Sequence, residues 1–263
     1  MGFTVRDVAR LKSEKKRFAM LTAYDYPTAR ILDEAGIPVL LVGDSLANVM
    51  LGYPNTLPVT MEEMLHHTRA VVRGASNALI VGDMPFGSYQ ISVEEGIRNA
   101  VRFLKEGGAH AVKLEGAQFE LTAALVERGI PVMAHLGLTP QSVHAMGGYR
   151  VQAKTDETAQ RLFSDSENLQ KAGAFSVVLE GIPNAVAKRV TETLGIATIG
   201  IGAGPDCDAQ VLVITDMLGM GSGSYPKFVK PYANLRETIT DAVTRYREEV
   251  EAGTFPDEAH SYS

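Results

Sequence analysis

Carboxylates close several apolar runs of this chain, and their type and placement suit metal-assisted carbon chemistry. Four of them come from four different runs: Asp44, Asp83, Glu115 and Glu180. Like charges gathered in a partly buried site raise one another's pKa unless a cation lies among them. Oxygen ligands without a supporting cluster of His or Cys suit a hard ion such as Mg²⁺. The pattern therefore indicates a site for Mg²⁺ and for the oxygen atoms of a substrate.

Other polar residues stand at the same run ends, namely Asp25, Ser45, Lys113 and His135. Lys113 lies two residues before Glu115, on the same face of a strand, so an ion pair between the two is a structural alternative to a binding role. His135 could serve only to bridge backbone groups at a strand end. Both alternatives stay open at the level of sequence.

The carboxylates have a structural alternative as well. A single aspartate at a run end is often a helix N-cap or a turn former, and this explanation stays open for Asp44 and Asp83 taken one at a time. It explains a set of four run ends less well. The motif Gly200–Gly204 resembles a phosphate loop, but its G-x-G-x-G spacing also suits a tight turn after a strand.

The elements that must position these residues repeat along the chain. Seven apolar runs alternate with amphipathic segments, at residues 18–24, 39–45, 78–85, 111–116, 131–137, 176–181 and 197–204. Near-continuous apolarity is typical of parallel strands that are buried on both faces. Residues 210–214 could be an eighth strand or the buried side of a helix, because short apolar runs do not separate the two.

Helical segments separate the runs. Thr60–Glu63 and Ser92–Glu95 are capping-box patterns that open two of them. Further helices are expected at 26–35, 119–128, 156–172 and 184–194, and another begins at Leu235. Right-handed βα crossovers of this length favour a (βα)₈ TIM barrel, with an open doubly wound sheet as the alternative. We expect one barrel domain over residues 1–263, with a short N-terminal helix and a C-terminal closing helix.

Barrel architecture also predicts where the function lies. Active sites of such barrels form where strands end and the following loops begin, which is where the polar residues stand. The longest irregular stretch, residues 138–155, is expected to be functional, because long loops inside compact domains usually are.

Composition excludes several classes of function. The net charge of −6 provides no basic field for a nucleic-acid backbone, and tryptophan is absent. Cys207 is the single cysteine, so an internal disulfide is excluded. No window holds about 18 uninterrupted apolar residues, so we expect no membrane span and a cytoplasmic location.

A string of segments carries a family resemblance: LTAYDYPTAR, LLVGDSL, TLPVT, DMPFGSYQ, VKLEG, HLGLTPQS, GGY, VLEGIP, IGIGAG and PKFVK. Over residues 4–260 the chain resembles the ketopantoate hydroxymethyltransferase family. The resemblance implies a barrel of the phosphoenolpyruvate mutase/isocitrate lyase type. It also implies Mg²⁺-assisted enolate formation and transfer of a hydroxymethyl group from 5,10-methylenetetrahydrofolate to 3-methyl-2-oxobutanoate. The product would be 2-dehydropantoate, in the first step of pantothenate biosynthesis, and the protein would be a homo-oligomer, typically a decamer.

The resemblance also implies roles for single residues. Glu180 matches the proton acceptor, and Asp44, Asp83 and Glu115 match the metal site. Substrate-binding residues are expected in the set Asp44, Ser45, Asp83, Lys113 and His135. Two loop positions depart from the family pattern, because Ala153 and Ala209 stand where glycine is usual.

Two other functions compete with this one. The same barrel and metal could serve a Mg²⁺-dependent lyase or mutase that acts on the carbon–carbon bond of a 2-oxo acid, and a requirement for folate separates the two. A non-catalytic barrel that binds a metabolite would be expected to lack part of the carboxylate set, which is complete here.

Overall fold

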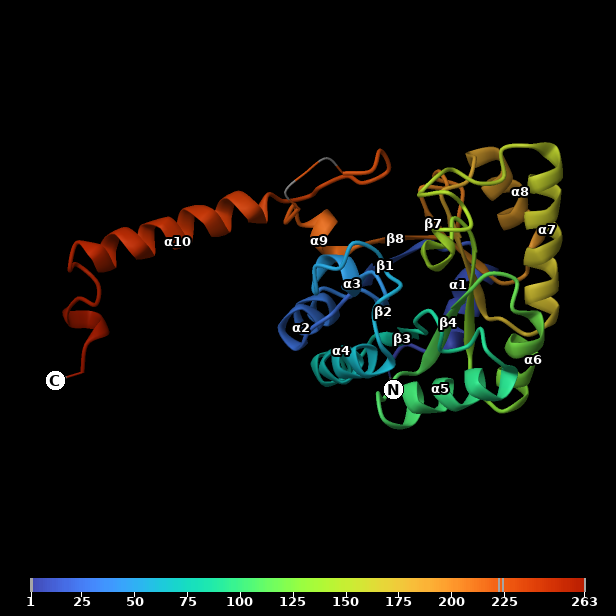
Figure 1. Cartoon of the computed structure of the whole chain (residues 1–263), viewed down its shortest axis with the longest axis horizontal. Coiled ribbons are helices and arrows are strands. Elements are labelled where there is room, and N and C mark those ends of the chain that lie inside the picture. The colour runs from blue at the N-terminus through green and yellow to red at the C-terminus, as the bar shows by residue number, and fades with distance from the viewer. Residues whose placement is uncertain (1, 222, 224, 263) are drawn as a thin grey trace. The chain divides into compact units, whose positions relative to one another are not determined.

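The computed structural model describes residues 2–221, 223 and 225–262. Its first unit is built on a closed barrel of parallel strands that are hydrogen-bonded in chain order (Figure 1). The strands are β1 (Phe18–Thr22), β2 (Val39–Val42), β3 (Leu79–Asp83), β4 (Ala111–Glu115), β5 (Val132–Gly137), β6 (Ser176–Glu180), β7 (Ala197–Ile201) and β8 (Ala209–Leu212). The predicted barrel is confirmed, and the open doubly wound sheet is wrong.

The eighth strand is the element that the sequence left ambiguous. Ala209 of β8 pairs with Ile199 of β7 on one side and with Phe18 of β1 on the other, so β8 closes the barrel. A short helix, α9 (Ile214–Met217), begins only after it. Ala209 therefore lies in a strand and not in a loop, so the expected loop position is wrong, and its side chain is buried in the barrel cluster.

Helices lie around the outside of the strands in Figure 1. They are α2 (Tyr26–Glu34), α4 (Met61–Gly74), α5 (Val93–Lys105), α6 (Phe119–Glu127), α7 (Asp156–Lys171) and α8 (Asn184–Thr193). The other helices described in this unit are α1 (Val5–Ser13) and two short ones, α3 (Leu46–Val49) and the 3₁₀ helix η1 (Pro140–Ser142). The predicted capping box at Thr60 is present, because Thr60 N–H donates to Glu63 Oε2 at 2.7 Å and Glu63 N–H donates to Thr60 Oγ1 at 3.2 Å. At Ser92 only one half of the predicted box forms, with Glu95 N–H donating to Ser92 Oγ at 3.1 Å.

The barrel interior has an apolar floor and a polar rim. Alternate residues of each strand share a face, and the apolar ones build a buried cluster to which α1 also contributes. On β3 the interior residue Val81 is followed two positions later by Asp83. On β4 Ala111 is followed by Lys113 and then by Glu115. The periodicity that packs the core therefore also points the charged residues into the mouth of the barrel.

The backbone conformation at Ala153 and at Gly204 bears on two features noted in the sequence. Ala153 adopts a φ of 54°, in the left-handed region, so the backbone keeps a shape that glycine adopts freely, at a cost of about 1 kcal/mol. Gly204 has a φ of 80°, and a Cβ atom there would collide with the side chain of Asn184. This close packing favours the tight-turn interpretation of the Gly200–Gly204 motif.

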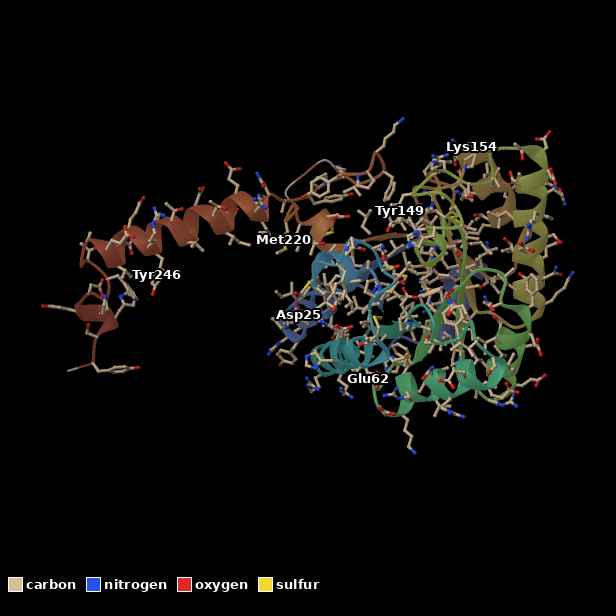
Figure 2. All side chains as sticks on the ribbon, viewed as in Figure 1. Asp25, Glu62, Tyr149, Lys154, Met220 and Tyr246 are labelled. Atoms are coloured by element: carbon tan, nitrogen blue, oxygen red, sulfur yellow. The ribbon has the colours of Figure 1, made fainter. Side chains whose placement is uncertain are left out.

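Residues 214–263 form a second compact unit. It contains α9, the longer helix α10 (Leu235–Glu251) and the 3₁₀ helix η2 (Glu258–His260). No residue of α10 is buried, and its exposed apolar side chains follow helical spacing: Ile239, Val243, Tyr246 and Val250 (Figure 2 labels Tyr246). Whether α10 closes a single barrel domain stays a prediction. Among the described residues, no helix combines the length and apolarity that crossing a membrane requires.

Asp33 ties helix α2 to the start of β3. Its buried carboxylate accepts hydrogen bonds from the main-chain N–H groups of Ser76, Asn77 and Ala78 at 3.1, 3.0 and 2.7 Å. Burial alone raises the pKa of Asp33, but these backbone hydrogen bonds outweigh it and hold the pKa below its ordinary value. The charged form is therefore the one that the fold stabilises.

We predict that Asp33→Asn lowers the free energy of unfolding by about 2 kcal/mol at pH 7, because hydrogen bonds to a charged acceptor are lost. A depressed folded pKa contributes stability above the unfolded value of about 3.9, and this contribution disappears as pH falls through the folded pKa. Urea denaturation at pH 7 and near pH 3 measures both effects. Glu34→Gln, on the exposed end of the same helix, is the control and should change stability by less than about 0.5 kcal/mol. Equal losses in the two variants would contradict the role of Asp33.

Candidate active site

The predicted polar residues meet at the carboxyl ends of neighbouring strands. In the sheet register Asp83 stands opposite Lys113, and Glu115 stands opposite His135. Glu180 ends β6, opposite Gly137 at the end of β5. The first four side chains are buried, whereas the side chain of Glu180 is 16% exposed. The site is therefore a buried charge cluster with Glu180 as its most accessible carboxylate.

Lys113 is the central cation of the cluster. Its Nζ donates to both carboxylate oxygens of Asp83, at 2.7 and 2.8 Å, and lies 3.7 Å from Glu115 Oε1. Burial lowers the pKa of Lys113, but the nearby carboxylates of Asp83, Glu115 and Asp44 raise it further, to above its ordinary value. Lys113 is therefore charged throughout the neutral range. Its main partner is the residue across the sheet and not the one two positions along its own strand.

Asp44 adds a third buried carboxylate. It follows β2, and its main-chain N–H donates to Asp83 Oδ2 at 3.1 Å. Burial first, and then the charges of Asp83 and Glu115, raise the pKa of Asp44 well above its ordinary value. Neither aspartate makes a helix-capping hydrogen bond within the described ranges, so the capping explanation is wrong for both. The carboxylates of the cluster therefore outnumber its cations.

Ser45 and Asp25 differ in their surroundings. Ser45 is half-buried beside Asp44, and its Oγ lies 2.9 Å from the hydroxyl of Tyr24. Asp25 accepts the main-chain N–H of Thr28 at 2.8 Å and caps α2 (Figure 2). Ser45 therefore belongs to the rim of the site, and Asp25 has the structural role that a strand-end aspartate often has.

His135 stands between two carboxylates. Its Nδ1 is 3.5 Å from Glu115 Oε1, and its Nε2 is 3.3 Å from Glu180 Oε2. Burial and Lys113 lower the pKa of His135, but Glu115 and Glu180 raise it more, to about 9. Neither ring nitrogen has a hydrogen-bond partner of good geometry among the described residues, so the attraction is mainly one of charge. The bridging of backbone groups is not its role.

Two residues of the site were missed by the sequence analysis. Gln141, in the irregular stretch 138–155, donates its main-chain N–H to Glu115 Oε2 at 3.0 Å and its side-chain amide to Asp44 Oδ2 at 3.0 Å. Tyr89 donates its hydroxyl to Gln141 Oε1 at 2.6 Å. Both residues lie in segments that carry the family resemblance, DMPFGSYQ and HLGLTPQS, and Gln141 also lies in the long irregular stretch, but no local pattern assigned either residue a role.

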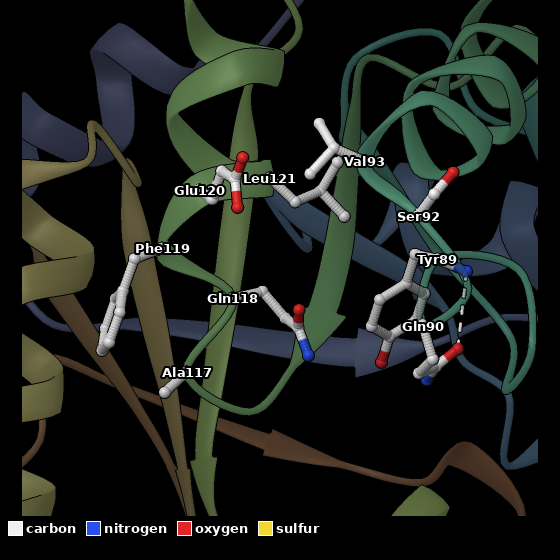
Figure 3. A pocket seen from close by; sticks show the side chains of 9 residues that line it. All are labelled: Tyr89, Gln90, Ser92, Val93, Ala117, Gln118, Phe119, Glu120 and Leu121. Atoms are coloured by element: carbon white, nitrogen blue, oxygen red, sulfur yellow. Dashed lines mark hydrogen bonds between the residues drawn. The ribbon is translucent and has the colours of Figure 1, made fainter.

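Tyr89 also reaches a cavity beside the cluster. The cavity has a volume of about 400 Å³ and lies between the loop that precedes α5 and the start of α6. Figure 3 shows Tyr89 and Gln90 on one side of it and Ala117 to Leu121 on the other. Burial raises the pKa of the Tyr89 hydroxyl well above its usual range, so it stays protonated as a hydrogen-bond donor.

Asp44 and Asp83 are neighbouring buried carboxylates that could hold a metal ion. The described residues contain no group of three His, Cys, Asp or Glu side chains in a ready-made ligand arrangement. Mg²⁺, however, is usually held by one or two carboxylates, with waters and substrate oxygens as the other ligands. The raised pKa of Asp44 beside Asp83 marks a place that a cation would stabilise. The full set of Asp44, Asp83 and Glu115 stays a prediction.

Comparison with known proteins decides between the possible functions of such a barrel. The model of the family described as ketopantoate hydroxymethyltransferase matches residues 2–258. The chain belongs to this family. Its relatives include 3-methyl-2-oxobutanoate hydroxymethyltransferases from Frankia alni (59% identical, covering 99% of this chain and 86% of the relative) and Syntrophus aciditrophicus (58% identical, 98% and 96%). A ketopantoate hydroxymethyltransferase family member is an enzyme, which contradicts the non-catalytic alternative.

Solved structures agree with the barrel type that the family resemblance implied. Phosphonopyruvate hydrolase aligns with a TM-score of 0.62 at 12% identity, covering 99% of this chain and 92% of that one. The 2,3-dimethylmalate lyase, titled a member of the PEP mutase/isocitrate lyase superfamily, aligns with a TM-score of 0.61 at 16% identity, with the same two coverages. At such identities the likeness concerns the fold alone. The family match favours the transferase over the lyase or mutase alternative.

We predict that His135 of the metal-free protein titrates near pH 9 in NMR spectra of ¹³C-labelled histidine. Because its folded pKa lies above the unfolded value of about 6.5, its contribution to stability is complete below pH 6.5 and is lost as pH rises through about 9. Glu180→Gln should lower this pKa by removing one of the two facing carboxylates. Glu120→Gln, on the exposed start of α6, should leave it unchanged. A titration near 6.5 in the parent protein would refute the charged form.

Proposed function

We propose that the chain transfers a hydroxymethyl group from 5,10-methylenetetrahydrofolate to 3-methyl-2-oxobutanoate, giving 2-dehydropantoate. The proposal rests above all on the family match over residues 2–258 of a chain that keeps the whole expected polar set in one cluster. The relatives' printed name is that of this activity. The first step of pantothenate biosynthesis is therefore the place we propose for this enzyme.

Lys113 and Ser45 are proposed to bind the anionic end of the oxo acid. The ammonium group of Lys113 is buried, so its charge acts through a medium of low polarity and attracts an anion strongly. The hydroxyl of Ser45 stands on the rim, where it can donate to a substrate carboxylate. With the positive charge of His135, these groups favour a substrate that carries or develops negative charge.

Glu180 is proposed as the base that removes the proton from carbon 3. It is the most accessible carboxylate of the cluster, and its Oε2 lies 3.3 Å from His135 Nε2. Removing such a proton with a carboxylate is uphill by more than about 10 pKa units, or about 14 kcal/mol. Glu180 therefore depends on positive charge beside the oxygen of the substrate as that oxygen becomes negative.

Asp44 and Asp83 are proposed to hold Mg²⁺, with Glu115 as a further ligand or as a partner of a metal-bound water. When bound, Mg²⁺ supplies Lewis-acid stabilisation of developing negative charge on a substrate oxygen. A phosphonopyruvate hydrolase of the same fold was solved with oxalate and Mg²⁺, which supports a metal-dependent site of this kind. The chain's own residues bind and orient the substrate and move the proton at Glu180.

Assembly and location extend the proposal. The family resemblance leads us to propose a homo-oligomer, with a decamer as the expected form, in the cytoplasm. The exposed apolar stripe of α10 is consistent with contacts between chains. Light scattering after gel filtration measures the mass of the assembly directly.

We predict that the purified enzyme forms 2-dehydropantoate only when 3-methyl-2-oxobutanoate, methylenetetrahydrofolate and Mg²⁺ are all present. Chelation of the metal should lower the rate by at least about 100-fold, because the uphill proton transfer then lacks its Lewis acid. Chromatographic detection of the product measures this. Cleavage or rearrangement of a 2-oxo acid without folate would instead support the lyase or mutase alternative.

We predict that Glu180→Gln slows solvent deuterium exchange at carbon 3 of 3-methyl-2-oxobutanoate by at least about 100-fold, since the amide cannot accept the proton. Substrate binding should persist, because Lys113 and Ser45 are unchanged. Proton NMR in D₂O follows the exchange, and calorimetry follows binding. Glu192→Gln, on the outside of the barrel, is the control. Undiminished exchange in Glu180→Gln would remove this residue from the role of base.

A further inference from the structure

Gln141 joins the loop after β5 to the ends of two other strands. Its side-chain amide nitrogen donates to Asp44 Oδ2 at 3.0 Å and to the carbonyl oxygen of Met84 at 2.9 Å. Its amide oxygen accepts from the hydroxyl of Tyr89 at 2.6 Å and from the amide of Gln90 at 3.1 Å. Both donors and both acceptor positions of the buried amide are therefore used. A side chain held in this way has a single orientation.

Tyr89 determines which way that amide faces. Its hydroxyl oxygen accepts the main-chain N–H of Glu115 at 3.1 Å, so its one proton is available for Gln141 Oε1. With its oxygen turned towards Tyr89, the amide presents its nitrogen to Asp44. A directed chain of hydrogen bonds thus runs from the backbone of β4 to the carboxylate that follows β2.

Gln141 holds one oxygen of each of two carboxylates. Its main-chain N–H donates to Glu115 Oε2 at 3.0 Å, while Glu115 Oε1 is buried without a hydrogen-bond partner among the described residues. Its side chain binds Oδ2 of Asp44 and makes no contact of this kind with Oδ1. The second oxygen of Glu115 lies 3.7 Å from Lys113 Nζ and 3.5 Å from His135 Nδ1.

We propose that Gln141 is a positioning residue that orients Asp44 and Glu115 for metal and oxo-acid binding, with Tyr89 fixing the orientation of its amide. The inference rests on the proposed function, since it takes Asp44 to be one of the residues that hold Mg²⁺. Gln141 itself touches neither the metal nor the reacting carbon. It acts by removing the freedom of two carboxylates that would otherwise turn away from each other's charge.

Calorimetric titration with Mg²⁺ alone tests this role without turnover. Gln141→Met keeps the length of the side chain and removes its hydrogen bonds, and it should raise the Kd for Mg²⁺ by about 10- to 100-fold. The same variant should lose kcat more than it changes the KM for the oxo acid. Gln152→Met is the matched control, because this side-chain amide lies in the same irregular stretch and, among the described residues, donates only to the carbonyl oxygen of Arg150. It should bind Mg²⁺ like the parent protein.

Tyr89→Phe tests the direction of the amide and stands in for Gln141→Met should that variant fail to fold. Removing one hydroxyl should raise the Kd for Mg²⁺ by about three- to tenfold, because Gln90 still donates to the amide oxygen. Failure of the parent protein to bind Mg²⁺ would contradict the proposed function. If the parent and the folded variants bind Mg²⁺ with Kd values within twofold of each other, the proposed role of Gln141 is wrong and the proposed function is not affected. This holds even if the variants have a lower Tm.

Discussion

The interaction on which the site depends is the buried ion pair between Lys113 and Asp83. Charges taken out of water are costly unless each is paired and hydrogen-bonded, and here both oxygens of Asp83 bind the one ammonium group. Lys113 also lies within reach of Glu115, so it offsets part of a second negative charge. The pKa of Asp44 is raised well above its ordinary value, first by burial and then by the charges of Asp83 and Glu115. A cation bound beside Asp44 would offset the repulsion among these carboxylates.

The rest of the fold supplies the fixed geometry that such a cluster requires. Neighbouring parallel strands set Asp83 beside Lys113 and Glu115 beside His135 through backbone register alone. Loops then add the finer restraints. Gln141 donates hydrogen bonds to two carboxylates, Glu115 of β4 and Asp44 after β2. Asp33 accepts three main-chain hydrogen bonds from the turn before β3. A small shift in any of these parts would change distances inside a medium that screens charge poorly.

Sequence reasoning predicted the barrel and the rim residues because both follow from short-range regularities. Strand runs and capping boxes are local, and a strand-end carboxylate is visible as a letter at a boundary. The partner of Lys113 was less visible: two residues along one strand span about 6.6 Å, whereas adjacent strands are about 4.8 Å apart, so Asp83 is the nearer group. Residues 210–214 lacked the length that separates a strand from a helix, and only pairing with both neighbours identifies β8.

Local sequence patterns could not identify Gln141 and Tyr89 as site residues, for a different reason. Their function comes from contacts between residues 97 and 52 positions apart, Gln141 with Asp44 and Tyr89 with Gln141, which no local pattern encodes. Ala153 shows the converse, since its left-handed backbone keeps the loop shape although the residue type departs from the family pattern.

In this barrel the same strands carry both the apolar core and the charged site. The apolar floor beneath the polar rim keeps these two tasks at different positions along each strand. Residues such as Val81 and Ala111 fill space, and the positions two further along carry charge. Rim positions can thus diverge over evolutionary time without emptying the layer that holds the strands together. Solved structures at 12 to 16% identity align over nearly the whole of this chain, so the fold itself persists through wide change in sequence.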